Sequence, residues 1–206
     1  GMITGNNADF VRFFHEISDD SFGRSFGSRE EASLSGKKWF PYQKGGPFRK
    51  YYGNLEYVVD WESDGHRLRT TTDKGGKVPA HAFNEEFIFK QNVNWSALTS
   101  GNFSARITLS GCLFDASGSA AFPRDHGLLY ILGAFLNSPV SREMIGYMNP
   151  TLNFQAWEIG SLPLLSHEHF DQNSVQYHTN GDRPGGGGRC LLDLHARPAR
   201  THCARA

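Results

Sequence analysis

Turn-forming residues recur between positions 38 and 123, and this feature of the sequence most limits the fold that the chain can adopt. Short runs of aromatic and β-branched residues alternate there with turns such as Gly45-Gly46-Pro47 and Gly53-Asn54. Runs of this kind, bounded by turn residues, are typical of short strands. We therefore predict a small, irregular β-sheet built from the segments Trp39–Tyr42, Tyr57–Trp61, Glu86–Lys90, Phe103–Thr108 and Gly111–Asp115.

Helical patterns lie on both sides of these sheet segments. Apolar residues repeat at helical spacing from Leu128 to Leu136, which predicts a helix with one buried face. A second helix is expected over Ser141–Met148, with Ser141 as its cap and the Asn149-Pro150 step as its end. The remaining expectations are a helix over Asn7–Ile17 capped by Asn6 or Asn7, a loop over Asp19–Lys37, and extended segments at Asn153–Gln155 and Ile159–Leu165.

The length of the chain suits one domain and a tail. Its 206 residues are 38% hydrophobic and 20% charged, which is typical of soluble globular proteins. For residues 1–166 we predict an α+β fold, in which helices flank a small irregular β-sheet. Residues 167–206 contain four consecutive glycines, Gly185–Gly188, and few aliphatic side chains. Such a composition buries little surface, so we expect this tail to be disordered.

Cysteine usage and hydropathy exclude several classes of protein. The three cysteines are widely spaced and form no Cys-x-x-Cys pair, which argues against a disulfide framework or a zinc site and suits the cytoplasm. The chain has no apolar run near 18 residues, so we expect no membrane segment. No Ser-His-Asp or Cys-His set is recognisable from the order of the residues. We therefore predict neither a catalytic nor a metal-binding residue.

Positive charge is concentrated between Lys37 and Lys77, although the whole chain is neutral. Nine basic residues oppose five acidic ones in this stretch, giving a net charge of +4. The turn Lys44-Gly45-Gly46-Pro47-Phe48-Arg49-Lys50 combines three cations with glycines, whose missing side chains let backbone amides approach a phosphate. A locally basic turn of this kind favours contact with a nucleic-acid backbone. An ordinary hairpin turn with solvated cations is the alternative.

Side chains suited to stacking on bases or to recognising base edges accompany this turn. Tyr52 can stack on a base, and Asn54 can form paired hydrogen bonds with adenine. The stretch Ser100–Arg106 is the second expected contact loop. For each individual residue, a place in a turn or on an ordinary surface is the alternative. The predicted DNA-contacting residues are Lys44, Gly45, Gly46, Arg49, Lys50, Tyr52, Asn54, Arg67, Arg69, Asn102, Ser104 and Arg106.

Four blocks of sequence are similar to one protein family. The most characteristic block is KWFPYQKGGPFRKYYGNLEYVVDWESDG. The others are GMITGNNADFVRFFHEI, WSALTSGNFSARITLSGCLFDASGSAAFP and LLYILGAFLNSPVSREMIGYMNPTLNFQAWEIGSLPLL. In their order and spacing they resemble adenine-specific DNA methyltransferases of the PglX type, from the BREX phage-defence systems. Type IIG restriction-modification enzymes are related to these. The resemblance covers about residues 1–166.

The resemblance implies that residues 1–166 are a fragment of a DNA target-recognition (specificity) domain. Such a domain holds double-stranded DNA while one adenine flips into a catalytic pocket elsewhere. Enzymes of this class use S-adenosylmethionine and an Asn/Asp-Pro-Pro-Tyr/Phe motif, which this chain lacks, since Asn149-Pro150-Thr151-Leu152 has neither the second proline nor the aromatic residue. We therefore expect no cofactor and no methyl transfer in this chain. Both would belong to the N-terminal methyltransferase domain of the parent enzyme.

The partners that the resemblance implies are double-stranded DNA, that methyltransferase domain and other subunits of the defence system. A protein–protein interaction module of the same defence complex is the alternative function. The neutral net charge and the 13% aromatic content also suit this alternative.

Overall fold

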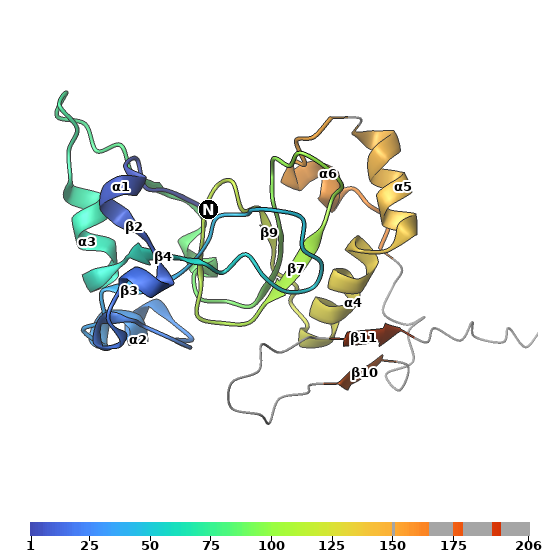
Figure 1. Ribbon diagram of the computed structural model, residues 1–206, viewed down its shortest axis with the longest axis horizontal. Coiled ribbons are helices and arrows are strands. Elements are labelled where there is room, and N and C mark those ends of the chain that lie inside the picture. Colours follow the sequence, from blue (N-terminus) through green and yellow to red (C-terminus); the bar gives the residue numbers. More distant parts are fainter. Residues whose placement is uncertain (150, 165–174, 179–190, 195–206) are drawn as a thin grey trace, which may run out of the picture. The chain divides into compact units, whose positions relative to one another are not determined.

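The computed structural model describes residues 1–149, 151–164, 175–178 and 191–194. The chain divides into two units, Gly1–Leu162 and Pro163–Ala206. The first unit combines small sheets with helices, which confirms the predicted α+β class (Figure 1). The domain boundary predicted after residue 166 stays a prediction.

A four-stranded sheet in the order β2-β4-β3-β8 organises the first part of this unit (Figure 1). Strand β4 pairs antiparallel with β2 and β3, and β3 also pairs parallel with β8. Phe40, Tyr42 and Val59 are fully buried in its core. A two-stranded sheet, β1 with β5, completes the sheets of this part. The elements of this part are β1 (Met2–Ile3), α1 (Asn7–Phe10), β2 (Val11–Phe13), α2 (Arg29–Leu34), β3 (Trp39–Gln43), β4 (Tyr57–Asp60), α3 (Glu62–Thr70), β5 (His81–Ala82) and β8 (Leu113–Phe114).

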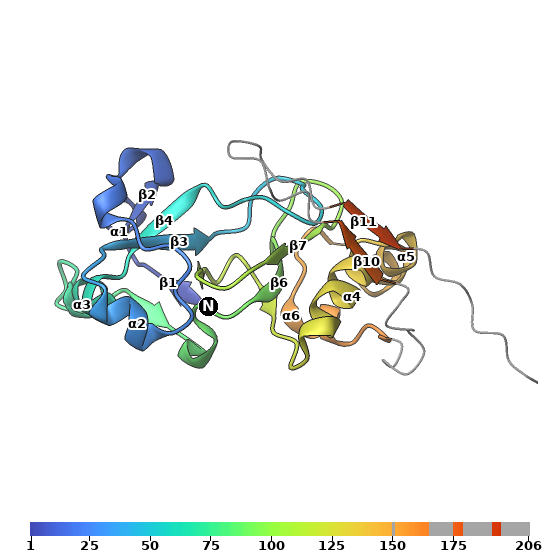
Figure 2. The same cartoon turned by 90° about the horizontal axis from the view of Figure 1, so that it is seen from below.

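A three-stranded antiparallel sheet in the order β7-β6-β9 organises the second part of the unit, with β9 labelled in Figure 1 and β6 in Figure 2. Helix α4 packs closely on one face of this sheet. A side-chain carbon added to Gly133 would lie 2.8 Å from the Cδ1 atom of Ile107, so a larger residue would require Ile107 to shift. The elements are β6 (Asn92–Trp95), β7 (Ala105–Thr108), β9 (Ala120–Ala121), α4 (His126–Leu136), α5 (Pro139–Met148) and α6 (Ala156–Gly160).

The described part of the second unit consists of Pro163, Leu164 and two antiparallel strands. Strand β10 (Val175–His178) pairs with β11 (Leu191–Leu194), an element that the sequence did not predict. The rest of the tail that we expected to be disordered lies outside the described residues.

The helix predicted over Asn7–Ile17 is wrong beyond its first turn. Asn6 does cap that turn, since its side chain accepts a hydrogen bond from the Ala8 amide. The chain then becomes β2, where Val11 is the register partner of Val59. Phe13 and Phe14 are consequently exposed, because pairing with β4 decides the conformation where local spacing favoured a helix.

Other departures from the predicted elements are local. The expected strand at Glu86–Lys90 is wrong, since Glu85–Phe87 forms a 3-10 helix, and helix α6 replaces part of an expected extended segment. Helix α2 interrupts the expected loop over Asp19–Lys37, and α3 and β6 were missed. Ser138, rather than Ser141, caps α5. The predicted strands near Trp39, Tyr57, Phe103 and Gly111 and the helix from Leu128 are confirmed as β3, β4, β7, β8 and α4.

Candidate nucleic-acid interface

The connection between β3 and β4 reaches the second sheet and returns. We call residues 44–56 the bridging loop. The Tyr51 amide donates to the Ala105 carbonyl and the Tyr51 carbonyl accepts from the Ile107 amide, both at 2.9 Å, so Tyr51 extends the sheet edge at β7. At Gly46 both backbone groups bond to the Ser96 hydroxyl, again at 2.9 Å. The bridging loop is therefore fixed to the second sheet at two points.

The second predicted contact loop lies beside the first. The Arg49 amide donates to the Ser104 hydroxyl at 3.3 Å, which joins the bridging loop to the stretch Ser100–Arg106. The structure thus brings together two segments that were predicted separately. The residues that this region exposes are Gly46, Pro47, Phe48, Arg49, Lys50, Tyr52, Ser100, Gly101 and Asn102.

Two exposed cations of the bridging loop have partners within the protein. Arg49 forms an ion pair with Glu56, and Lys50 donates to the carbonyl of Asn137 at 2.9 Å, where α4 ends. The Arg49 side chain is 47% exposed. A partly solvated pair of this kind stabilises a protein by only about 0–1 kcal/mol, so a phosphate can compete for the arginine.

Lys44 has a different environment from these two cations. Its ammonium group lies 2.8 Å from a carboxylate oxygen of Asp115 and its side chain is only 20% exposed. Together with Asn7 and Ser117, among other residues, this pair lines a cavity of about 360 Å³. Because a carboxylate neutralises Lys44, the structure gives no support to the phosphate contact predicted for it.

Asp115 connects three segments of the chain through hydrogen bonds. It accepts from the Tyr42 hydroxyl at 2.6 Å, from Lys44 and from the backbone amide of Ser117 at 2.8 Å. Burial alone would raise the pKa of Asp115, but bonds from Lys44, Ser117 and Tyr42 outweigh it and hold the pKa below its usual value. Burial, with the nearby Asp115 charge, raises the pKa of Tyr42. Both groups therefore keep their ordinary protonation at neutral pH.

Several predicted contact residues are buried rather than exposed. Asn54, Ser104 and Arg106 have 3%, 5% and 1% exposure, and Gly45 is also buried. Gly45 has a φ of +75° and close neighbours in Ser96 and Ser117, which explains a glycine at this position. In the described conformation Gly45 and Asn54 are the buried part of the bridging loop, and Ser104 and Arg106 lie on the adjoining strand segment.

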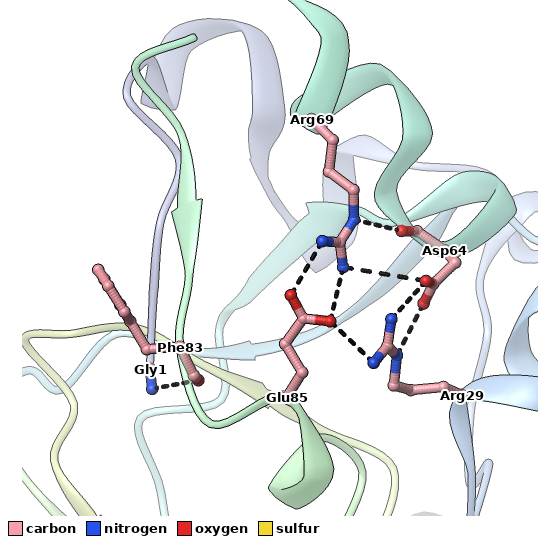
Figure 3. A network of polar contacts seen from close by, with 6 residues as sticks. All are labelled: Gly1, Arg29, Asp64, Arg69, Phe83 and Glu85. Atoms are coloured by element: carbon pink, nitrogen blue, oxygen red, sulfur yellow. Dashed lines mark hydrogen bonds and ion pairs between the residues drawn. The ribbon is translucent and has the colours of Figure 1, made fainter.

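Arg67 and Arg69 lie on α3 and not on the bridging loop. Arg67 pairs with Asp60, while Arg69 belongs to a cluster with Arg29, Asp64 and Glu85 (Figure 3). The Arg69 and Glu85 groups approach to 2.9 Å, and this hydrogen bond is the main cause that lowers the pKa of Glu85. Two cations balance two carboxylates here, so the cluster fits a structural role that joins α2, α3 and residue 85.

Sequence reasoning missed Phe48 and Ser96 as parts of this region. Phe48 is 54% exposed at the outer end of the bridging loop. Its place between Pro47 and Arg49, inside a turn, was the available signal. Ser96 follows a strand that was not predicted, so nothing in its surroundings pointed to the bridging loop.

The Asn149-Pro150 sequence, which is the part of this chain most similar to the Asn/Asp-Pro-Pro-Tyr/Phe motif, has Asn149 engaged in internal hydrogen bonds. The Asn149 amide oxygen accepts from the amide and the hydroxyl of Thr151, and its nitrogen donates to Asn153 and Glu158. All its hydrogen-bonding capacity serves this turn, so it is not available to a target amine. Within the described ranges, no three His, Cys, Asp or Glu side chains form a group that could hold a metal. Nor does any helix there have the length and apolarity to cross a bilayer.

The sequence of this chain is similar to segments of two known adenine-specific methyltransferases. The chain is 42% identical over 165 residues to the adenine-specific methyltransferase PglX of Lacticaseibacillus casei, covering 80% of this chain and 14% of that protein. It is 32% identical over 174 residues to the adenine-specific methyltransferase BrxX of Escherichia coli, covering 83% of this chain and 13% of that protein. No family model matches it. The predicted resemblance is therefore confirmed: the chain is homologous to one segment, about one seventh, of the PglX and BrxX adenine-specific methyltransferases.

Proposed function

We propose that this chain is the DNA-contacting specificity segment of an adenine-specific methyltransferase that acts in a BREX phage-defence system of the cytoplasm. S-adenosylmethionine and the catalytic residues would lie in another part of the parent enzyme. The names of the two relatives support the reaction and the substrate class. The segment would fix the register of the duplex so that one adenine reaches the distant pocket.

One observation carries this proposal, namely the meeting of the two predicted contact loops. Arg49 and Lys50 supply cations for phosphates, and Tyr52 and Phe48 supply exposed aromatic rings beside them. Asn102, on the adjoining loop, adds an exposed amide that can bond to a base edge. Phosphate contacts would position the duplex, and the amide and the rings would contribute to its recognition.

Replacing Arg49 and Lys50 together by alanine is expected to weaken DNA binding by about tenfold or more and to reduce its salt dependence. Loss of two phosphate contacts lowers the slope of log K against log salt by about 1.8, or 0.9 per contact. Titration of a labelled duplex at several low salt concentrations measures both quantities. The matched control is Lys74→Ala with Lys77→Ala, which removes the same charge from another exposed loop. If the two double variants weakened DNA binding equally, the loss would reflect the overall charge of the protein, and Arg49 and Lys50 would make no particular contact with DNA.

A second function, that of a protein–protein interaction module in the same defence complex, is favoured by exposed apolar side chains near α5 and α6. Tyr147 is 88% exposed, Leu98 72% and Trp157 69%. Exposed apolar groups of this size are common at protein interfaces. A segment that binds the methyltransferase domain or another defence subunit tightly, with no affinity for DNA at low salt in a pull-down, would have this function instead.

A further inference from the structure

The two faces that strands β6 and β7 form differ in the polarity of their side chains. One face carries Val93 and Ile107, which pack beneath α4 near Gly133. The opposite face is polar, yet all its side chains are at most 5% exposed. Sheet faces that are buried are ordinarily apolar, and polar faces are ordinarily solvated. We call this unusual surface the polar face, and it consists of Asn92, Asn94, Ser96, Ser104, Arg106 and Thr108.

Arg106 is only partly satisfied within the polar face. Its Nε donates to the amide oxygen of Asn94 at 3.1 Å, and one terminal nitrogen lies 3.4 Å from the Ser96 hydroxyl. Among the residues that the structure describes, the other terminal nitrogen, Nη1, has no hydrogen-bond partner, and neither has the amide oxygen of Asn54. A guanidinium group in a fully satisfied network would use all five of its N–H groups.

Arg106 also lacks a counter-charge. No carboxylate in the described ranges lies within ion-pair distance of it. Burial lowers the pKa of Arg106 to about 10, with Arg49 acting in the same direction and Glu56 opposing it. The side chain is therefore a cation at neutral pH. A buried charge without a partner destabilises a fold, and a neutral side chain of similar volume is often better tolerated there.

The bridging loop covers this cation. Ser96, which contacts Arg106, also bonds to both backbone groups of Gly46. Asn54 touches Gly46 and donates to the Pro47 carbonyl at 3.0 Å. Positive φ values at Gly46 (+134°) and Gly53 (+127°) place a glycine on each side of the exposed residues of the loop. A path to Arg106 would open if the Gly46–Lys50 part left its hydrogen bonds to Ser96 and Ser104.

We propose that Arg106 is a reserved anion ligand, which binds a DNA phosphate when the Gly46–Lys50 part of the bridging loop shifts. The phosphate oxygens would supply the missing acceptor for Nη1 and the missing negative charge. Arg49 and Lys50, at the surface above, would guide the phosphate towards it. This inference rests on the proposed function, since it names a buried group as part of the same DNA interface.

The test compares Arg106→Met, which keeps the volume and removes the charge, with the unchanged 206-residue chain. Without ligand, the Met variant is expected to unfold at the same temperature or a higher one. Its affinity for a mixed-sequence duplex is expected to fall by about tenfold, and its salt slope by about 0.9. The DNA affinity of Arg106→Lys, which keeps the charge but loses the paired N–H groups of the guanidinium, should lie between those of the unchanged chain and Arg106→Met. A purely structural arginine would give the opposite stability result: a lower unfolding temperature with unchanged affinity in the folded protein.

Inorganic pyrophosphate gives a second and independent measurement. It should raise the unfolding temperature of the unchanged chain, relative to chloride at equal ionic strength, and should not raise that of Arg106→Met. If the Met variant does not fold, the absence of this shift in the unchanged chain overturns the proposal. Unaltered DNA affinity in a folded Met variant also overturns it and leaves the proposed function standing. A chain that shows the pyrophosphate shift but binds no duplex at low salt retains an anion site, and the proposed function is then wrong.

Discussion

Replacing Asp115 by alanine is expected to lower the free energy of unfolding of the first unit by about 3 kcal/mol, the usual loss when one partner of a buried pair is removed. Without the carboxylate, the Tyr42 hydroxyl loses its 2.6 Å acceptor in a fully buried position. The Lys44 ammonium group, whose side chain is only 20% exposed, loses its counter-charge. Urea unfolding monitored by tryptophan fluorescence would measure the loss.

The matched control is Ser117→Ala, which removes one donor to the same carboxylate and leaves the charges balanced. Removing one hydrogen bond of this kind costs about 1 kcal/mol. Equal losses for Asp115→Ala and Ser117→Ala would mean that the carboxylate contributes no more than an ordinary turn contact.

Acid should remove the contribution of Asp115 to stability. Because the folded protein holds the pKa of this carboxyl below its usual value, the stabilisation is fully present above the pKa of the unfolded chain, about 4. It decreases as the pH falls from there through the folded pKa. The difference in unfolding free energy between the unchanged chain and Asp115→Asn should therefore be constant from pH 6 to 7 and shrink below about pH 4. A difference that grew in acid would contradict this assignment.

The sequence predicted best what depends on neighbouring residues. The apolar spacing from Leu128 identified α4, and the aromatic run at Trp39 identified β3. It failed at residues 11–17, where the apolar spacing predicted a helix but pairing with β4 makes residues 11–13 a strand. The turn at residues 44–50 could be predicted as a candidate contact because its glycines and cations are adjacent in sequence.

Burial of the candidate site residues could not be predicted in the same way. Lys44 and Arg49 look alike in sequence, yet only Lys44 has a buried carboxylate 71 residues away as its partner. Arg106 and Ser104 alternate with apolar residues as on a half-exposed strand. Their face is buried because a loop from another part of the chain lies over it. Contacts across such separations leave no local pattern.

Replacing Gly65 by alanine is expected to destabilise the first unit by about 3 kcal/mol. Ser63, Asp64 and Gly65 have φ values of 49°, 59° and 73°, so three successive residues are in the left-handed region. A left-handed conformation costs a residue with a side chain about 1–2 kcal/mol. The new methyl carbon would also lie 2.7 Å from the indole ring of Trp61, which is 1% exposed. Overpacking of this kind costs about 1–3 kcal/mol more.

Gly76→Ala is the matched control for this substitution. Gly76 has nearly the same φ, +76°, and no atom within 4 Å of the added carbon, so only the backbone cost of about 1–2 kcal/mol applies. Chemical unfolding of both variants separates the two contributions, and equal losses would show that Trp61 moves aside freely. The indole cannot do so easily, because Arg69 lies over the Trp61 ring. Arg69 is itself held by Asp64, which also binds Arg29 (Figure 3). Combining Gly65→Ala with Trp61→Leu should therefore cost less than the sum of the two single losses, because the smaller side chain leaves room for the methyl group.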